Sequence, residues 1–130
     1  VANGGHIRGL LANHSGKHPW DESWEVDAAV EALNVFSSRW SVEILTALYI
    51  AGPKRFNKLK GLLSGISSRT LSDKLKFLTE EGFVDRQVDD GTPIKVEYAL
   101  SSHGRTCGRL LSPLVAHLKL ENGSLITQAE

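Results

Sequence analysis

The sequence lacks the features that define several large classes of protein. Its 130 residues contain one cysteine, Cys107, and no methionine. One cysteine excludes an internal disulfide bond and a multi-cysteine metal site, and it fits a reducing compartment. No apolar run approaches the roughly 20 residues that a membrane-spanning helix needs, and residues 1–20 hold no apolar block of the signal-peptide kind. We therefore expect a cytoplasmic protein with no membrane partner.

The chain also lacks an excess of charge, because 15 basic residues balance 15 acidic ones. The charges are nevertheless segregated along the sequence. Residues 21–43 carry six acids and one base, whereas residues 54–77 carry seven bases and one acid. Such asymmetry gives a small domain one positive face that can bind phosphate groups. On charge alone, a solvated surface helix is an equally good interpretation.

Apolar residues recur at helical spacing in four segments. The predicted helices span residues 26–36, 41–51, 57–63 and 68–81. The third helix is expected to turn Leu62 inward. The fourth has Ser67 as a suitable N-cap and places Leu71, Leu75 and Leu78 on one buried face.

The hydrophobic period changes from 3.6 to 2 after the fourth helix. Phe83–Val88 and Ile94–Leu100 flank an Asp-Asp-Gly-Thr-Pro turn, which predicts a β-hairpin. A last helix is predicted over residues 102–120, kinked at Pro113 with Ser112 as a fresh N-cap. The predicted organisation is an arm over residues 1–22, a domain over residues 23–120 and a tail over residues 121–130.

Two short helices joined by a tight turn and followed by a hairpin predict a winged helix-turn-helix. Its second helix, about Ser68–Glu81, would enter a major groove ~12 Å wide with its leucines behind it. At 100° per residue, Arg69 lies about 160° from Leu71, on the opposite face. Arginine pairs with guanine, and serine and threonine pair with bases or phosphates. The predicted base contacts are Ser68, Arg69, Thr70, Ser72 and Asp73.

Basic residues before and along these helices suit contacts to the DNA backbone. The predicted phosphate contacts are Lys54, Arg55, Lys58, Lys60 and Lys76. The wing adds Arg86 and Lys95, the only bases of the hairpin, beside the acids Asp85, Asp89 and Asp90. An ordinary helical hairpin with a charged exterior would produce the same pattern, so these residues alone leave both interpretations open.

Five sequence blocks between residues 27 and 120 stand in a specific order and spacing. The blocks are ALNVFSSRW (32–40), GPKRFNKL (52–59), GISSRTLSDKL (65–75), EGFVDR (81–86) and VEYAL (96–100), with Gly104 after the last. This pattern resembles the HxlR-type winged helix-turn-helix transcriptional regulators, relatives of the MarR-like group. The resemblance implies a homodimer joined by its first and last helices, with two recognition helices in successive major grooves and wings beside the phosphates. Many oxidant-sensing members carry a cysteine where this chain has Asp27, so thiol sensing by that route is not implied.

The last predicted helix is itself a reason to expect a dimer. Leu110, Leu114 and Leu118 form one apolar stripe, and Leu111 and Val115 form a second. A domain this small cannot bury both stripes within itself, so one is expected to meet a second copy. The predicted dimer contacts are Val30, Leu33, Leu110, Leu111, Leu114, Val115 and Leu118.

Two remaining features could suggest catalysis or metal binding. His103 and Cys107 are four residues apart on one helical face, the spacing in which a base could activate a thiol. No orienting acid lies nearby, so core packing is the preferred interpretation. His14 and His18 have ligand-like spacing, but a metal site needs three or four ligands. Trp40, beside Ile44, is expected in the core.

We therefore expect a mainly α domain with a β-hairpin wing, in which a three-helix DNA-binding core carries N- and C-terminal dimerisation helices. The expected function is that of a homodimeric, sequence-specific transcriptional regulator that binds double-stranded DNA and has no enzymatic activity, cofactor or metal. The alternative is a winged-helix interaction module whose basic face binds an acidic protein. The sequence leaves open whether a small-molecule effector is a further partner.

Overall fold

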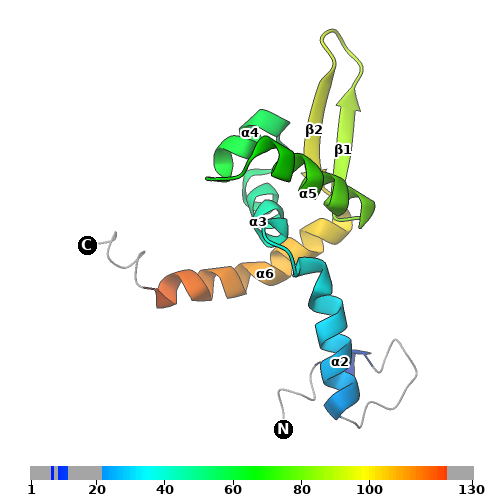
Figure 1. The fold of residues 1–130 in the computed structure, drawn as a ribbon, viewed down its shortest axis with the longest axis vertical. Helices are drawn as coiled ribbons and strands as arrows, with labels where there is room; N and C mark the ends of the chain where they lie inside the picture. Colours follow the sequence, from blue (N-terminus) through cyan, green and yellow to red (C-terminus); the bar gives the residue numbers. More distant parts are fainter. Residues whose placement is uncertain (1–6, 8, 12–21, 123–130) are drawn as a thin grey trace. The chain divides into compact units, whose positions relative to one another are not determined.

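The computed structural model describes residues 7, 9–11 and 22–122, and the chain divides into two compact units, Val1–Ser38 and Arg39–Glu130. In the first unit, helix α2 spans Glu22–Leu33 and continues into a 3-10 turn at Asn34–Phe36 (Figure 1). The predicted domain over residues 23–120 therefore crosses the boundary between the units. Most of the predicted arm and tail, including His14 and His18, lies outside the described residues.

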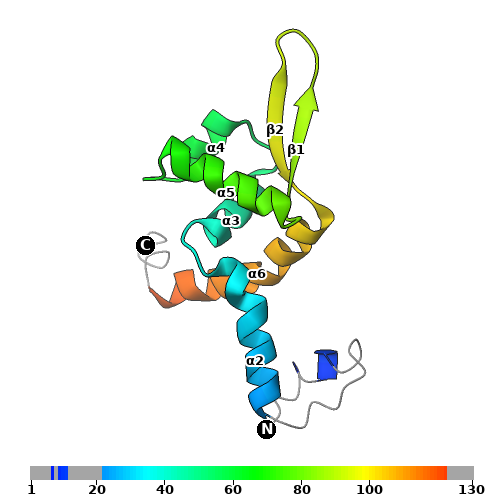
Figure 2. The same ribbon diagram turned by 45° about the vertical axis from the view of Figure 1, so that its right-hand side comes forward.

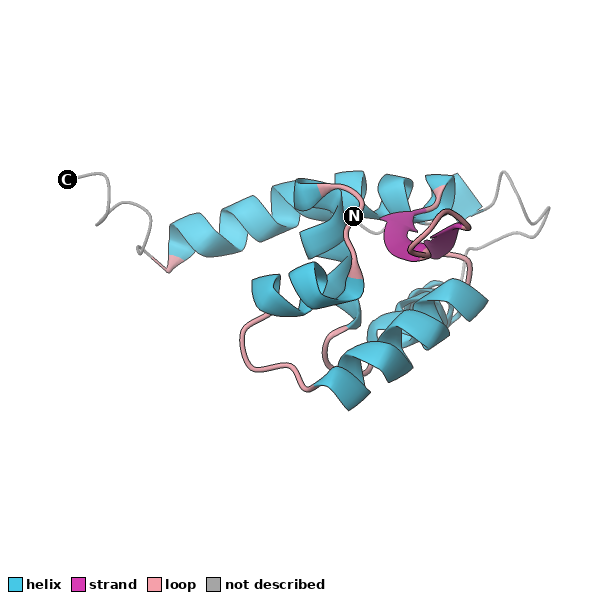
Figure 3. Cartoon of the chain, turned by 90° about the horizontal axis from the view of Figure 1, so that it is seen from above, coloured by secondary structure: helices cyan, strands magenta, loops and turns pink. Residues whose placement is uncertain are grey.

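The described part of the second unit, residues 39–122, contains four helices and one hairpin. The elements are α3 (Ser41–Ala51), α4 (Phe56–Leu62), α5 (Ser68–Glu80), β1 (Val84–Asp89), β2 (Lys95–Leu100) and α6 (Ser102–Glu121). The two strands form one antiparallel sheet, which Figure 3 shows in magenta beside the helices. The predicted fold class, mainly α with a hairpin wing, is confirmed. Among the described helices, none is long and apolar enough to cross a membrane.

The core of the second unit is built from α3, α4, α5 and the foot of the hairpin. Its fully buried large side chains include Ile44, Leu45, Leu59, Leu71, Leu75, Leu78 and Val84. Each such aliphatic side chain contributes about 1.5–3 kcal/mol by leaving water. The prediction for the α5 leucines is confirmed, whereas the prediction for Leu62 is wrong. Leu62 is 53% exposed, because Leu59 and Leu63 take the inward positions at the end of α4.

The turn between α4 and α5 is specified by local backbone chemistry. Gly65 adopts a φ of 90°, a left-handed conformation that a side chain would disfavour. Ser67 then caps α5: its Oγ accepts a hydrogen bond from the Thr70 backbone N–H at 3.1 Å and donates to Thr70 Oγ1 at 2.9 Å. The predicted N-cap is confirmed, and it fixes where α5 begins.

The hairpin is anchored at its foot and exposed at its tip. Its strands pair antiparallel from Val84 opposite Leu100 to Asp89 opposite Lys95, and Figures 1 and 2 show it projecting beyond the helices. At the foot, backbone hydrogen bonds of 3.0 and 2.8 Å join Lys54 to Tyr98. Ile94 was predicted to begin the second strand, but that strand begins at Lys95. Ile94 lies in the turn just before that strand and is exposed.

Helix α6 begins against the foot of the hairpin. The hydroxyl of Ser101 donates to the Gly82 carbonyl O at 2.6 Å and accepts from the Gly104 N–H at 3.0 Å. Gly104 and Gly108 are the buried residues of this helix. A Cβ at Gly104 would collide with the backbone O of Phe83, so the absence of a side chain permits the close approach.

The expected interruption of the last helix is absent. Helix α6 continues through Pro113 to Glu121. Ser112 is not an N-cap, because its hydroxyl donates to the Gly108 carbonyl O one turn earlier at 2.8 Å. This back-bonding is the local pattern of a serine inside a helix, not that of a serine at a helix start. The prediction of a fresh helix start at Ser112 is therefore wrong.

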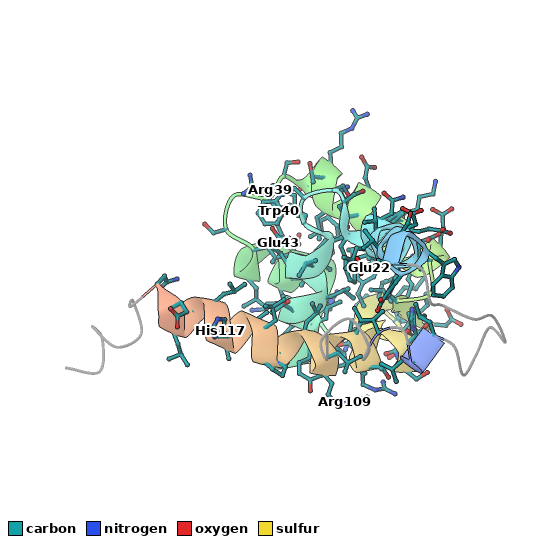
Figure 4. All side chains as sticks on the ribbon, turned by 90° about the horizontal axis from the view of Figure 1, so that it is seen from below. Glu22, Arg39, Trp40, Glu43, Arg109 and His117 are labelled. Atoms are coloured by element: carbon teal, nitrogen blue, oxygen red, sulfur yellow. The ribbon has the colours of Figure 1, made fainter. Side chains whose placement is uncertain are left out.

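Trp40 also differs from expectation. It is half-buried rather than in the core, and its φ of 84° is left-handed. Its backbone N–H donates to Glu43 Oε1 at 3.1 Å, and the guanidinium carbon of Arg39 lies 4.6 Å from its ring centroid. Figure 4 shows these three residues together at the start of α3. Because the left-handed backbone precedes the first turn, the indole turns toward Arg39 instead of the core.

Candidate nucleic-acid interface

Helix α5 has one apolar face and one polar face. Leu71, Leu75 and Leu78 are buried against the core, while Arg69 and Lys76 are exposed. The leucines recur at i, i+4 and i+7, so the residues between them point outward. Figure 2 shows α5 at the surface of the unit, beside the foot of the hairpin. The second helix of the motif thus offers a continuous polar surface to a ligand.

The predicted base contacts occupy the first turns of α5. Ser68, Arg69, Ser72 and Asp73 are exposed. Thr70 is half-buried, and its Oγ1 accepts the hydrogen bond from the N-cap. Four of the five side chains are therefore accessible at one end of the helix, and the fifth also belongs to the capping arrangement. Their contacts to bases remain predictions.

The predicted phosphate contacts divide into two groups. Arg55, Lys58 and Lys76 are exposed, and Lys60 is half-buried. Lys54 is engaged elsewhere: its Nζ donates to the carbonyl oxygens of Ala51 at 3.0 Å and Pro53 at 3.4 Å. A cation at this point stabilises the carbonyl-rich end of α3. A phosphate would have to compete with these hydrogen bonds for Lys54.

The two bases of the hairpin lie in different surroundings. Lys95 pairs with Asp89 across the strands near the tip, so a carboxylate stands opposite its ammonium group. Arg86 pairs with Tyr98 nearer the foot. The charge of Arg86 is therefore less opposed by a cross-strand neighbour than that of Lys95.

A cleft between α5 and the hairpin was not foreseen from the sequence. It has a volume of about 300 Å³, and its walls include Ser72 and Lys76 of α5 and Arg86 and Tyr98 of the hairpin. From the sequence, Tyr98 is only one of the alternating residues of the second predicted strand. Its position opposite Arg86 depends on the pairing register, which the turn and the packing of α5 decide together.

Helix α6 exposes apolar side chains from Leu110 onward. Leu110, Leu114 and Leu118 are between 53% and 65% exposed, whereas Leu111 is half-buried. Figure 4 shows the side chains along this helix, with His117 labelled on its second half. In the first unit, Val30 and Leu33 of α2 are each 63% exposed. Each set is an exposed apolar surface on the described part of its own unit.

The histidine and cysteine of α6 have structural surroundings. The His103 ring stacks on Phe83 with centroids 4.5 Å apart. Burial raises the pKa of the half-buried Cys107 thiol, which reduces the fraction of reactive thiolate at neutral pH. Within the described residues, no group of three His, Cys, Asp or Glu side chains could hold a metal ion. Nothing in this arrangement favours nucleophilic catalysis.

Comparison with known proteins finds HTH-type transcriptional regulators. Over 96 residues the chain is 36% identical to the HTH-type transcriptional regulator YtcD of Bacillus subtilis, covering 73% of this chain and 75% of that protein. Over 84 residues it is 33% identical to the HTH-type transcriptional regulator YvaP of the same organism, covering 65% of this chain and 77% of that protein.

Two solved structures have a similar fold. The transcriptional regulator ytfH from Salmonella typhimurium superposes with a TM-score of 0.62 at 31% identity, over 78% of this chain and 89% of that one. The reduced form of the transcriptional regulator YodB from B. subtilis gives a TM-score of 0.59 at 31% identity, over 66% and 83%. The sequence model of the HxlR-like helix-turn-helix family matches residues 35–124. The chain belongs to the HxlR-like helix-turn-helix family.

Proposed function

We propose that the chain is a homodimeric, sequence-specific DNA-binding transcriptional regulator that places α5 in the major groove. One observation carries the proposal. The exposed face of α5 concentrates Arg69, Ser72 and Lys76 opposite a fully buried leucine stripe. A major groove admits a helix of this kind and offers hydrogen-bonding base edges to such side chains.

Charge on the neighbouring elements supports the same function. Arg55 and Lys58 are exposed at the N-terminal end of α4, and Arg86 is exposed on the hairpin. Contacts to phosphate fix the register of a helix on the duplex without reading sequence. On this proposal, α4 and the hairpin hold the DNA backbone while α5 reads the bases.

The exposed leucines of α6 support the dimer. More than half of the surface of Leu110, Leu114 and Leu118 is accessible, and apolar patches of this kind mark interaction surfaces. We propose that this stripe meets its equivalent in a second copy, together with Val30 and Leu33 of α2. A two-fold dimer would present two α5 helices to half-sites about 10 base pairs, or a small multiple, apart.

The test is binding to duplex DNA as a function of salt concentration. If six basic residues contact phosphate, the logarithm of the association constant falls with log salt at a slope near −5, about 0.9 per contact. Selection of bound sequences from a random duplex pool then identifies the preferred site. Absence of any duplex binding at 50 mM salt would overturn the proposal and favour a protein-interaction module.

A further inference from the structure

The cleft between α5 and the hairpin combines two cations with hydroxyl groups. Lys76 lies on one wall and Arg86 on the other. Arg86 is directly opposite Tyr98 in the antiparallel register, so both side chains lie on the same face of the hairpin. That face is the one that meets α5, because both residues line the cleft with α5 side chains.

The backbone of Tyr98 is fixed by hydrogen bonds, whereas its hydroxyl is available to a ligand. Its backbone N–H and carbonyl O both bond to Lys54, at 2.8 and 3.0 Å. Within the described part of the chain, no protein group forms a hydrogen bond with the Tyr98 hydroxyl. Thr79 lines the same cleft, but its hydroxyl donates to the Leu75 carbonyl O at 2.7 Å. Tyr98 is therefore a fixed, half-buried donor beside Arg86.

The geometry of DNA decides what would cross this cleft. A phosphate backbone separates the major groove from the neighbouring minor groove. If α5 lies in the major groove and the hairpin lies beside it, this backbone must pass between α5 and the hairpin. The cleft is the gap between these two elements, so it is the point where a phosphate comes nearest to both.

We infer that the cleft seats one backbone phosphate, with the Tyr98 hydroxyl as a neutral donor between Lys76 and Arg86. The inference rests on the proposed function, since it takes α5 to be in the groove. Glu80 also lines the cleft, and its carboxylate opposes the phosphate. Lys76 and Arg86 thus attract the phosphate, Tyr98 donates to it as a neutral group and Glu80 repels it, and each of these three roles has a different experimental signature.

The experiment measures fluorescence anisotropy of a labelled random-sequence duplex of about 30 base pairs over a range of salt concentrations. Tyr98→Phe is expected to weaken binding about tenfold, because it removes a hydrogen bond to a charged group. The salt slope stays unchanged, since a neutral hydroxyl releases no counterion. Arg86→Gln and Lys76→Gln weaken binding and also reduce the slope by about one unit per subunit in contact. Glu80→Gln strengthens binding.

The matched control is Tyr49→Phe, the same change on the other tyrosine, whose ring packs against Gly108 at the α3 and α6 contact. Its affinity for the duplex should equal that of the unmodified protein. Suppose that the unmodified protein binds the duplex. If Tyr98→Phe then binds equally well, or if its salt dependence is less steep than that of the unmodified protein, the phosphate seat is refuted while the proposed function stands. If the unmodified protein binds no duplex, both fail. Should Tyr98→Phe not fold, Arg86→Gln, at an exposed position, carries the test.

Discussion

Helices α5 and α6 are both amphipathic, but what they leave exposed is opposite in chemistry. Helix α5 buries three leucines and exposes Arg69 and Lys76. Helix α6 packs its N-terminal turns through two glycines and exposes leucines from Leu110 onward. A polar, cationic face suits a polyanion, whereas an apolar face suits another protein surface. On the proposed function, DNA binds the exposed face of α5 and a second subunit binds the exposed leucines of α6.

The largest expected effect tests the apolar half of this comparison. Leu114→Glu places a charge in the middle of the exposed stripe and should convert the dimer to a folded monomer. Affinity for a two-half-site duplex should fall about 100-fold or more, because the second half-site no longer binds at a high effective concentration. Sedimentation measures the mass, circular dichroism checks the fold, and anisotropy measures the affinity.

The matched control for this variant is Leu62→Glu. Leu62 on α4 and Leu114 on α6 are each 53% exposed, so the two substitutions introduce the same charge at equal accessibility. Leu62→Glu should remain dimeric. If the unmodified chain sediments as a monomer at tens of micromolar, the two-fold arrangement is wrong, and α6 has another partner.

A second prediction concerns the first half of α6. Gly104→Ala should lower the free energy of unfolding by about 1–3 kcal/mol, since its Cβ would collide with the Phe83 backbone at the foot of the hairpin. Gly61→Ala is the control: an added Cβ meets nothing within 4 Å in α4, and alanine should stabilise that helix by about 0.5–1 kcal/mol. Urea denaturation measures both. Equal effects of the same sign would contradict the close packing at Gly104.

Local chemistry explains which parts of the fold were predictable. Ser67 caps α5 and Leu71 begins a regular buried stripe, and both follow from sequence spacing alone. Leu62 is predicted to face inward because it is apolar and lies in a helix, but it is exposed at the end of α4. Burial at an element's end depends on tertiary contacts that periodicity does not contain.

The candidate site shows the same limit. Exposure of Arg69 could be predicted from its angle to Leu71, because both lie on one helix. The engagement of Lys54 with the α3 carbonyls could not, since it depends on where the chain turns after Pro53. The position of Tyr98 beside Arg86 required the register of two strands. At this site, the exposure that follows from one helix could be predicted, and the contacts that join two elements could not.

The smallest expected effects test the polar half of the comparison. Arg69→Ala removes an exposed side chain near the start of α5. The variant should weaken the binding free energy for the selected site by about 1–3 kcal/mol and that for unrelated DNA only slightly, because it removes a contact to a base edge. Anisotropy with the selected and random duplexes measures both values. Equal losses on the two would mean that α5 does not read sequence through Arg69.

Arg55→Ala is the matched change on the same residue type, before α4 instead of on α5. Arg55 is exposed, and α4 precedes the reading helix, so its predicted contact is to phosphate. Binding should weaken by a similar factor on both duplexes, and the salt slope should fall by about one unit per subunit in contact. Because Arg69 and Arg55 have the same side chain, the two variants remove the same charge. If the two variants differ in how their loss of affinity depends on DNA sequence, the difference therefore comes from the position of the arginine. Such a difference distinguishes a contact to a base from a contact to a phosphate.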